Sequence, residues 1–141
     1  MSITVRHCAP SDQGAICALW ARVFGYTEAR NDPAKVLAGK LSWDGRVLVA
    51  AEADRLLGAL MVGYDGHRGW LYRMAVDADV RRRGIGRELV RAAEQHLAAL
   101  GCTKVNLQLH TANEAGARFW ESVGYGREAR IDMGKNLTQG A

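Results

Sequence analysis

The stretch Met74-Ala75-Val76-Asp77-Ala78-Asp79-Val80-Arg81-Arg82-Arg83-Gly84-Ile85-Gly86 links an apolar, strand-like run to a strongly amphipathic segment. Gly101 follows that segment at a C-terminal cap position. The apolar residues of the segment recur at helical spacing and are Ile85, Leu89, Ala93, Leu97 and Leu100. The stretch is therefore predicted to lead from a strand, Trp70 to Val76, into a long helix.

The start of such a helix is a site for an anion. Its first amides have no partner within the helix and lie at the positive end of the helix dipole. Gly84 and Gly86 lack a Cβ, so the backbone can adopt positive φ and approach one phosphate closely. Side chains of the neighbouring arginines can add charge-assisted hydrogen bonds. A solvated loop is the alternative, but the position between a strand and an amphipathic helix favours a phosphate site.

Other phosphate-binding sites fit this stretch less well. The dinucleotide motif is excluded because the third glycine and the later acidic residue are missing, and a P-loop because no Gly-Lys-Ser/Thr follows. Five arginines fall within eleven positions, with no aromatic residue among them, which favours a compact phosphate over nucleic acid. They are Arg81, Arg82, Arg83, Arg87 and Arg91.

Length and composition indicate one soluble domain, residues 1–141. The chain has 141 residues, of which 48% are hydrophobic, and a formal charge of +4. No apolar run reaches membrane-spanning length and no leader pattern opens the chain, so a cytoplasmic location is expected. The three cysteines show no paired spacing, so neither a disulfide nor a metal site is expected.

The N-terminal part alternates strands and helices. A strand is predicted over residues 3–7, then a helix capped within Pro10-Ser11-Asp12 and ending near Gly25. A second helix is predicted to begin at Asp32-Pro33. The segment from Tyr26 to Asp44 is expected to shape an acceptor pocket.

Strands then dominate. Runs at residues 46–51, 56–64 and 70–76 predict an antiparallel meander. The passage through the long helix to a strand at 104–110 predicts a parallel pairing, so the sheet should be mixed. A helix over 113–123 and a final strand over 125–133 complete an α/β (α+β) fold.

Two blocks resemble the GNAT acetyltransferase superfamily. One is Met74-Ala75-Val76 followed by Arg81-Arg82-Arg83-Gly84-Ile85-Gly86, which is similar to the family's Arg/Gln-x-x-Gly-x-Gly/Ala. The other runs from Asn113 to Tyr125 and is similar to Asn-x-x-Ala-x-x-Phe-Tyr-x-x-x-Gly-Phe. The stretch from Tyr64 to Gly69 further resembles a small bacterial subgroup of uncharacterised acetyltransferases. The resemblance implies a mixed, mostly antiparallel sheet of six to seven strands with about four helices.

The resemblance also implies a binding site for acetyl-CoA. The main chain of Met74, Ala75 and Val76 would pair with the pantetheine arm, and Asn113 would meet it from the other side. The main-chain amide of Met74, or that of a neighbour, is the expected donor to the thioester oxygen. The pyrophosphate would be held by Arg81, Arg82, Arg83, Gly84, Ile85, Gly86 and Arg87.

Two positions depart from the family pattern. The usual acid is a tyrosine seven residues after the asparagine, and here it is Trp120, whose indole cannot protonate a thiolate. Gln108 stands where N-terminal acetyltransferases of the family carry a glutamate base. The proton could instead pass to water, to His110, or to one of three further candidates: Asp65, His67 and Glu52. Asp65 and His67 are also typical of a turn.

The sequence therefore predicts an N-acetyltransferase that acts on an amine of a small molecule, amino acid or peptide. A non-catalytic acyl-CoA sensor of the same fold is the alternative, because the usual acid and base are missing. No metal, nucleic acid or membrane partner is expected. The oligomeric state stays open, with a homodimer as one option.

Overall fold

The computed structural model describes residues 2–25 and 28–138. It forms two units, Met1–Leu107 and Gln108–Ala141, and each is described here by itself. Tyr26 and Thr27, at the start of the segment expected to shape an acceptor pocket, lie outside the described residues.

The first unit is built on a mixed sheet of five strands in the order β1-β2-β3-β4-β5. The first four pair antiparallel, and β4 pairs with β5 in parallel, as the sequence predicts. The strands are β1 (Thr4–His7), β2 (Val47–Glu52), β3 (Arg55–Tyr64), β4 (Gly69–Val76) and β5 (Val105–Leu107). In the central strand β2 every residue except the last is buried, which fits its uninterrupted apolar run.

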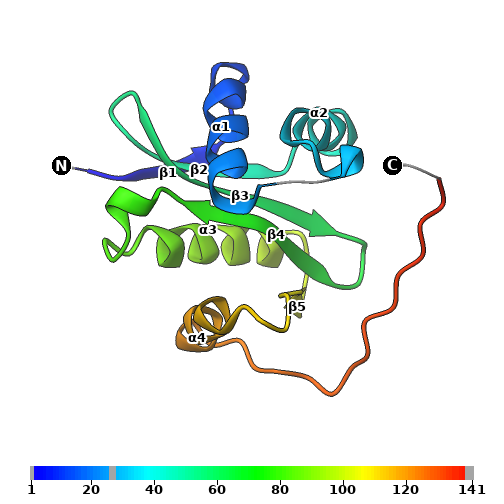
Figure 1. Ribbon diagram of the computed structural model, residues 1–141. Coiled ribbons are helices and arrows are strands. Elements are labelled where there is room, and N and C mark those ends of the chain that lie inside the picture. The colour runs from blue at the N-terminus through cyan, green and yellow to red at the C-terminus, as the bar shows by residue number, and fades with distance from the viewer. Residues whose placement is uncertain (1, 26–27, 139–141) are drawn as a thin grey trace. The chain divides into compact units, whose positions relative to one another are not determined.

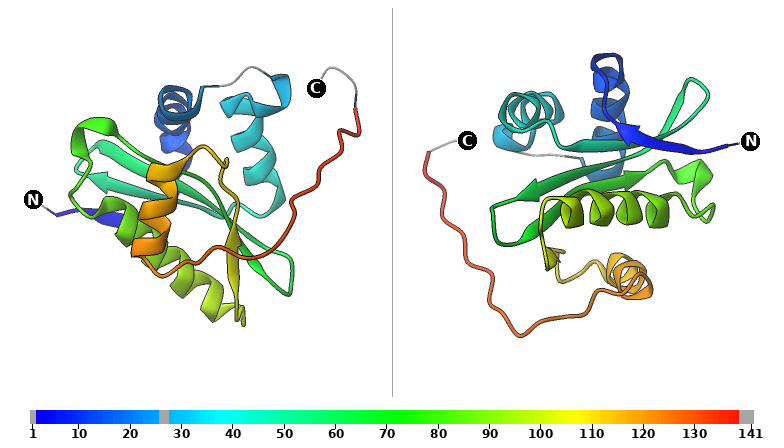
Figure 2. Two further views of the ribbon diagram at one scale, coloured as in Figure 1. Left: turned by 60° about the horizontal axis from the view of Figure 1, so that its bottom comes forward. Right: turned by 180° about the vertical axis from the view of Figure 1, so that it is seen from behind.

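Helices cover both faces of this sheet (Figures 1 and 2). The helices α1 (Gln13–Phe24) and α2 (Pro33–Trp43) lie on one face, and α3 (Ile85–Ala99) lies on the other. Short 3-10 turns precede each helix: η1 (Pro10–Asp12), η2 (Ala29–Asn31) and η3 (Ala78–Val80). With α4 (Glu114–Ser122) in the second unit, the predicted number of about four helices is confirmed.

Each helix buries the face that its sequence pattern indicates. On α1 and α2 the fully buried side chains are Ile16, Leu19, Trp20 and Leu37, which pack with Val47, Val49, Ala59 and Ala75 of the sheet. On α3 they are Ile85, Leu89, Ala93 and Leu97, whereas Leu100, predicted to continue the stripe, is 40% exposed. Leu100 follows the last turn of α3 and therefore lies beyond the covered sheet surface.

One close approach joins α3 to the sheet. A Cβ on Gly58 of β3 would lie 3.0 Å from both the Ala75 carbonyl oxygen and Cδ1 of Leu89, and 3.2 Å from Cγ2 of Ile85. A side chain there would crowd Ile85 and Leu89, so glycine allows the N-terminal half of α3 to pack closely. The start of the helix therefore lies directly against β3.

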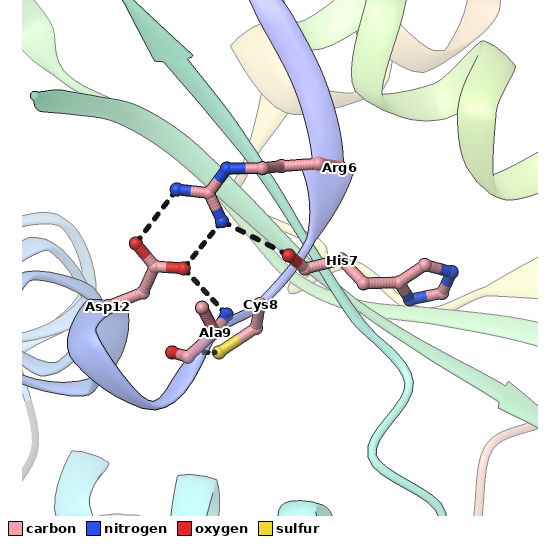
Figure 3. Close-up of polar contacts among 5 residues, drawn as sticks. All are labelled: Arg6, His7, Cys8, Ala9 and Asp12. Carbon is pink, nitrogen blue, oxygen red and sulfur yellow. Dashed lines mark hydrogen bonds and ion pairs between the residues drawn. The ribbon is translucent and has the colours of Figure 1, made fainter. Parts of the chain in front are cut away.

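The entry into α1 is held by an ion pair rather than by the predicted cap (Figure 3). The Asp12 carboxylate accepts hydrogen bonds from Nη1 of Arg6 at 2.7 Å and from the amide of Ala9 at 2.7 Å. It therefore closes the β1–η1 turn, and no side-chain cap bond is formed at the start of α1. The hydrogen bond from Arg6, together with the Ala9 amide, lowers the pKa of Asp12. By contrast, Asp32 accepts from the amide of Lys35 and caps α2 as predicted.

The strand count differs from the expected six to seven. The predicted final strand over 125–133 is wrong, because those residues form coil in which Ile131 and Met133 are 88% and 87% exposed. The segment carries four charged residues, so it has no continuous apolar face to bury. The strand predicted over 104–110 is shorter, at Val105–Leu107.

Candidate functional site

Strand β4 carries a bulge at its middle. Met61 of β3 pairs with Tyr72 and Ala59 pairs with Ala75, so Leu60 alone faces both Arg73 and Met74. Arg73 has φ of 48°, a left-handed conformation that arginine rarely adopts. A bulge at this point interrupts the ladder and re-aims the backbone of Met74.

The second half of β4 has an open edge. The parallel pairing with β5 covers only Gly69, Trp70 and Leu71. From Tyr72 to Val76, β4 has no β5 partner within the part of the chain that the structure describes. Main-chain groups along such an edge can accept an extended ligand as an added strand.

The loop before α3 has the backbone of an anion site. Arg82 has φ of 71° and Gly84 has φ of 78°, with Arg81 at −63° before them. Arg81 is extended, with ψ of 156°, so the chain changes direction at Arg82 and again at Gly84. Left-handed residues in such a loop can turn neighbouring amides toward an anion. Gly84 is the N-cap of α3 and provides no side-chain cap bond, so the first-turn amides face outward from the positive end of the helix.

Gly84 is required for conformation and not for packing. A Cβ built on it would meet no atom within 4 Å, so the space above the amides is open. Gly86, in contrast, is buried in the first turn of α3. The two glycines therefore differ: Gly84 shapes the loop, and Gly86 lies in the covered part of the helix.

The arginines of this loop fall into two groups. Arg83 forms an ion pair with Glu52 of β2, with Nη2 and Oε2 2.7 Å apart. Arg81, Arg82 and Arg87 form no ion pair among residues 2–25 and 28–138. Those three cations are available for an anionic ligand, whereas Arg83 primarily anchors the loop to the β2–β3 turn.

A second ion pair strengthens that anchor. Arg55, the first residue of β3, contacts the carboxylates of Asp79 and Asp77 from η3. The β2–β3 turn thus holds the connection before α3 at both of its ends.

Two of the proposed bases are already engaged. The hydrogen bond from Arg83 lowers the pKa of Glu52. Asp65 accepts from the amides of Arg68 and His67 in an Asx turn, and these bonds lower its pKa. Both carboxylates are therefore poor proton acceptors at neutral pH, and the turn interpretation of Asp65 is confirmed.

In the second unit Asn113 caps α4. Its Oδ1 accepts from the amide of Gly116 at 2.9 Å, and a Cβ on Gly116 would come within 2.5 Å of the Asn113 side chain. His110 accepts from the amide of Ala112 through Nδ1 at 3.1 Å. In a neutral ring the proton is then on Nε2.

Trp120 is a packing residue. It is 7% exposed and lies edge-to-face against Phe119 and Tyr125, with centroids 5.2 Å apart in both pairs. Gln108 donates to the Asp132 carboxylate at 2.6 Å. The Trp120 ring is thus held in aromatic packing, and the Gln108 side chain is held by an acid of the same unit.

Neither a cluster of metal ligands nor a membrane-spanning helix is found among the described residues. No group of three or more histidine, cysteine, aspartate or glutamate side chains there could hold a metal ion. The three cysteines are free thiols. Within residues 2–25 and 28–138, no helix combines the length and apolarity that a membrane crossing needs.

Sequence reasoning missed Arg73. Its guanidinium carbon lies 5.6 Å from the ring centre of Trp20 and 6.0 Å from that of Phe24, both on α1. The available signal was a single charged residue inside the apolar run of β4. The bulge that turns this side chain toward α1 has no sequence signature, since arginine does not favour positive φ.

Comparison with known proteins decides the family. The Acetyltransferase (GNAT) family profile matches residues 13–125. The chain belongs to the GNAT acetyltransferase family. It is also 34% identical over 136 residues to an acetyltransferase of Pectobacterium atrosepticum, which covers 96% of each chain. As a GNAT protein with acetyltransferase relatives, it is an N-acetyltransferase by class.

Solved GNAT structures share the fold. An aminoglycoside acetyltransferase from an uncultured soil metagenomic sample, in complex with sisomicin, has a TM-score of 0.77 at 22% identity. The match covers 96% of this chain and 97% of that one. The NatC complex bound to Gag peptide and CoA has a TM-score of 0.77 at 21% identity, with 93% and 89% covered.

Proposed function

We propose that this protein transfers an acetyl group from acetyl-CoA to a primary amine of a small molecule, amino acid or peptide, by direct attack in a ternary complex. The observation that carries the proposal is the left-handed pair Arg82 and Gly84 directly before α3. Two such residues, one of them not glycine, cost free energy in the empty protein. A ligand that binds the converging amides accounts for that cost.

The pyrophosphate is assigned to the loop and first turn of α3. Amides from Arg82 to Arg87 would surround it, including those of Arg83, Gly84, Ile85 and Gly86. The unpaired side chains of Arg81, Arg82 and Arg87 would add charge. These groups fit a diphosphate, which has enough oxygens for both sets of donors.

The pantetheine arm is assigned to the open edge of β4. The main chain of Met74, Ala75 and Val76 would hydrogen-bond the arm as a strand does. Asn113 is proposed to contact it as well; its Oδ1 already caps α4, so its amide NH2 is the group left for this.

Bound acetyl-CoA supplies an activated thioester. The amide of Met74, re-aimed by the bulge, would donate to the carbonyl oxygen and stabilise the charge that develops there. Alignment and exclusion of water provide much of the remaining acceleration. The attacking amine must be neutral, so its proton passes to water or to a nearby side chain before attack.

His110 is the proposed partner for proton transfer. Because Nδ1 accepts from Ala112, a neutral His110 ring carries its proton on Nε2, where it could hydrogen-bond the departing sulfur. The proton that the thiolate takes up would come from the attacking amine, which loses it as the new amide forms, by way of water. His67, which forms no ion pair among the described residues, is the alternative acceptor for the amine proton.

A non-catalytic acyl-CoA sensor is the second candidate. It is favoured by the packing role of Trp120 and by the ion pair that holds Glu52. Incubation of acetyl-CoA with a panel of amines separates the two, because only the enzyme releases free CoA. Tight binding without release for any amine would select the sensor.

Calorimetry with CoA directly tests the pyrophosphate site proposed at the loop and first turn of α3. The change Gly84→Ala forces a Cβ into left-handed backbone at a cost of about 1–2 kcal/mol, so CoA affinity should fall about tenfold. Gly66→Ala is the matched control, because Gly66 has φ of 89° and open space but lies in the β3–β4 loop. No heat from CoA at millimolar concentration, or equal affinity in Gly84→Ala, would refute the site.

A further inference from the structure

Arg73 has an unusual environment for a cation. It leaves β4 at the bulge, is partly buried, and lies beside the rings of Trp20 and Phe24. Its backbone is fixed by Trp20, whose Nε1 donates to the Arg73 carbonyl oxygen at 3.0 Å. Two aromatic rings and a buried anchor therefore hold the guanidinium in one direction.

This guanidinium has no carboxylate partner among residues 2–25 and 28–138. Its one polar side-chain contact is from Nη2 to Oδ1 of Asn31, a neutral group, at 3.5 Å. Arginines at other positions of the first unit do pair with acids, for example Arg6 with Asp12 and Arg22 with Asp77. Burial is the sole cause that lowers the pKa of Arg73, so no acid offsets it.

A partly buried cation without a counter-ion is unfavourable. The flanking rings recover about 0.5–2 kcal/mol through cation–π attraction. A neutral side chain of similar length would pack against Trp20 and Phe24 without the desolvation cost. The charge is therefore explained by something outside the chain that carries the opposite sign.

The position of Arg73 indicates which molecule that is. It immediately precedes Met74, whose amide is assigned to the reacting carbonyl, and it lies on the α1 face of the sheet. The proposed pyrophosphate site follows the C-terminal end of β4, at the start of α3. An anion bound by Arg73 would thus belong to the second substrate.

We infer that Arg73 selects amine acceptors that carry an anionic group, a carboxylate or a phosphate, close to the reactive nitrogen. This inference rests on the proposed acetyl transfer. The guanidinium fork suits either oxyanion. The ring of Phe24, 46% exposed, offers apolar surface to the rest of such an acceptor.

Paired acceptors test the inference. L-phenylalanine is compared with L-phenylalaninamide for a carboxylate, and O-phosphoethanolamine with ethanolamine for a phosphate. Arg73→Gln should lower kcat/KM for the anionic member of the preferred pair about 10- to 150-fold, mainly through KM, and leave the neutral member unchanged. The ratio of kcat/KM for the anionic acceptor to that for the neutral one is compared between the wild type and Arg73→Gln. Differences in amine basicity are the same in both proteins and therefore cancel. Arg73→Lys should retain part of the preference.

Arg68→Gln is the matched control. It removes the same charge from the β3–β4 loop, where Arg68 contacts Asp65 through its main chain. It should leave the discrimination between acid and amide unchanged. Equal loss in Arg68→Gln would mean that net charge, and not the Arg73 site, sets the preference.

A readout independent of turnover is the indole N–H signal of Trp20 in a 1H–15N correlation NMR spectrum, identified by its loss in Trp20→Phe. This cross-peak should shift when phenylalanine or phosphoethanolamine is added in the presence of CoA. It should not shift with the neutral analogues, nor in Arg73→Gln. A shift with all four compounds, or with none, overturns the inference.

The two failures are distinguishable. If acetyl-CoA binds and neutral amines react as well as anionic ones, the role of Arg73 is wrong and the acetyl transfer stands. If no amine releases CoA, the acetyl transfer fails, and the Trp20 cross-peak still decides whether Arg73 binds anions.

Discussion

The indole of Trp20 in α1 donates a 3.0 Å hydrogen bond to the carbonyl oxygen of Arg73 in β4, 53 positions later. The bulge releases this carbonyl from the sheet, and a fully buried side chain satisfies it. The bond ties the helix to the strand at the point where the site is proposed.

Trp20→Phe should therefore reduce the free energy of unfolding by about 1–3 kcal/mol, because a buried carbonyl loses its donor. Urea unfolding followed by far-UV circular dichroism measures the change. Trp43→Phe is the control, since Trp43 is 85% exposed and its loss should have little effect. Equal stability of Trp20→Phe and the wild type would show that the bulge does not depend on this bond.

Gly58→Ala should destabilise the first unit by about 1–3 kcal/mol, because the added Cβ overlaps the Ala75 carbonyl and the Leu89 side chain. Gly39→Ala in α2 is the opposite case: a Cβ there meets nothing within 4 Å, and alanine favours the helix. Thermal unfolding of both variants provides the comparison. A stabilised Gly58→Ala would contradict the close packing of α3.

The Arg6–Asp12 pair should make stability depend on pH. The folded-state pKa of Asp12 is below its ordinary value of 3.8, so its stabilising effect is complete above that value and is lost as pH falls through the folded pKa. Arg6 is 41% exposed, so screening limits the effect to about 1 kcal/mol.

Asp12→Asn should thus be less stable than the wild type at pH 6, and the difference should shrink toward pH 2. Urea titrations across that range measure it, with Asp54→Asn in the β2–β3 turn as the control. A difference that stays constant with pH would mean that the carboxylate charge is not involved.

Glu52→Gln should leave unchanged the decrease of kcat/KM at low pH, which is the acid limb of the pH profile. Arg83 keeps Glu52 ionised and occupied, so it is not expected to accept the amine proton. The test is the rate of CoA release between pH 5 and 9. Loss of the acid limb in this variant would assign Glu52 as the base after all.

Asn113→Ala should weaken α4 by about 0.5–2 kcal/mol, because Oδ1 no longer accepts from the Gly116 amide. Asn113→Ser keeps a capping oxygen and should retain most of the stability. Hydrogen exchange of the α4 amides reports the effect locally. Unchanged hydrogen exchange in Asn113→Ala would show that the Asn113 side chain does not stabilise α4.

Much of the first unit follows from local patterns. The run at 46–51 predicts the buried strand β2, and the stripe from Ile85 to Leu100 predicts the buried face of α3 as far as Leu97. The alternation at 3–7 predicts β1, whose residues are nevertheless exposed or half-buried. These signals are local in sequence and depend on burial alone. The strand predicted over 125–133 is wrong, because its four charged residues leave no continuous apolar face to bury.

Ion pairs between residues far apart in sequence, and positive φ at residues other than glycine, could not be predicted from the sequence. The Arg83–Glu52 ion pair joins residues 31 positions apart. Arg83 was a predicted phosphate ligand and Glu52 a proposed base, and the sequence did not indicate that they pair with each other. The positive φ of Arg73 and Arg82 had no sequence signal, because neither is a residue that prefers it. In the loop before α3, only the positive φ at Gly84 could be predicted, because glycine favours it.

The β2–β3 turn, bounded by Glu52 and Arg55, predicts which positions change together among related sequences. Ala53 there has φ of 53°, and the acid and the base on either side of it reach Arg83 and Asp79. Natural variation should therefore couple position 52 to 83 and position 55 to 79. A homologue that has lost one charge of a pair is expected to have lost the other as well.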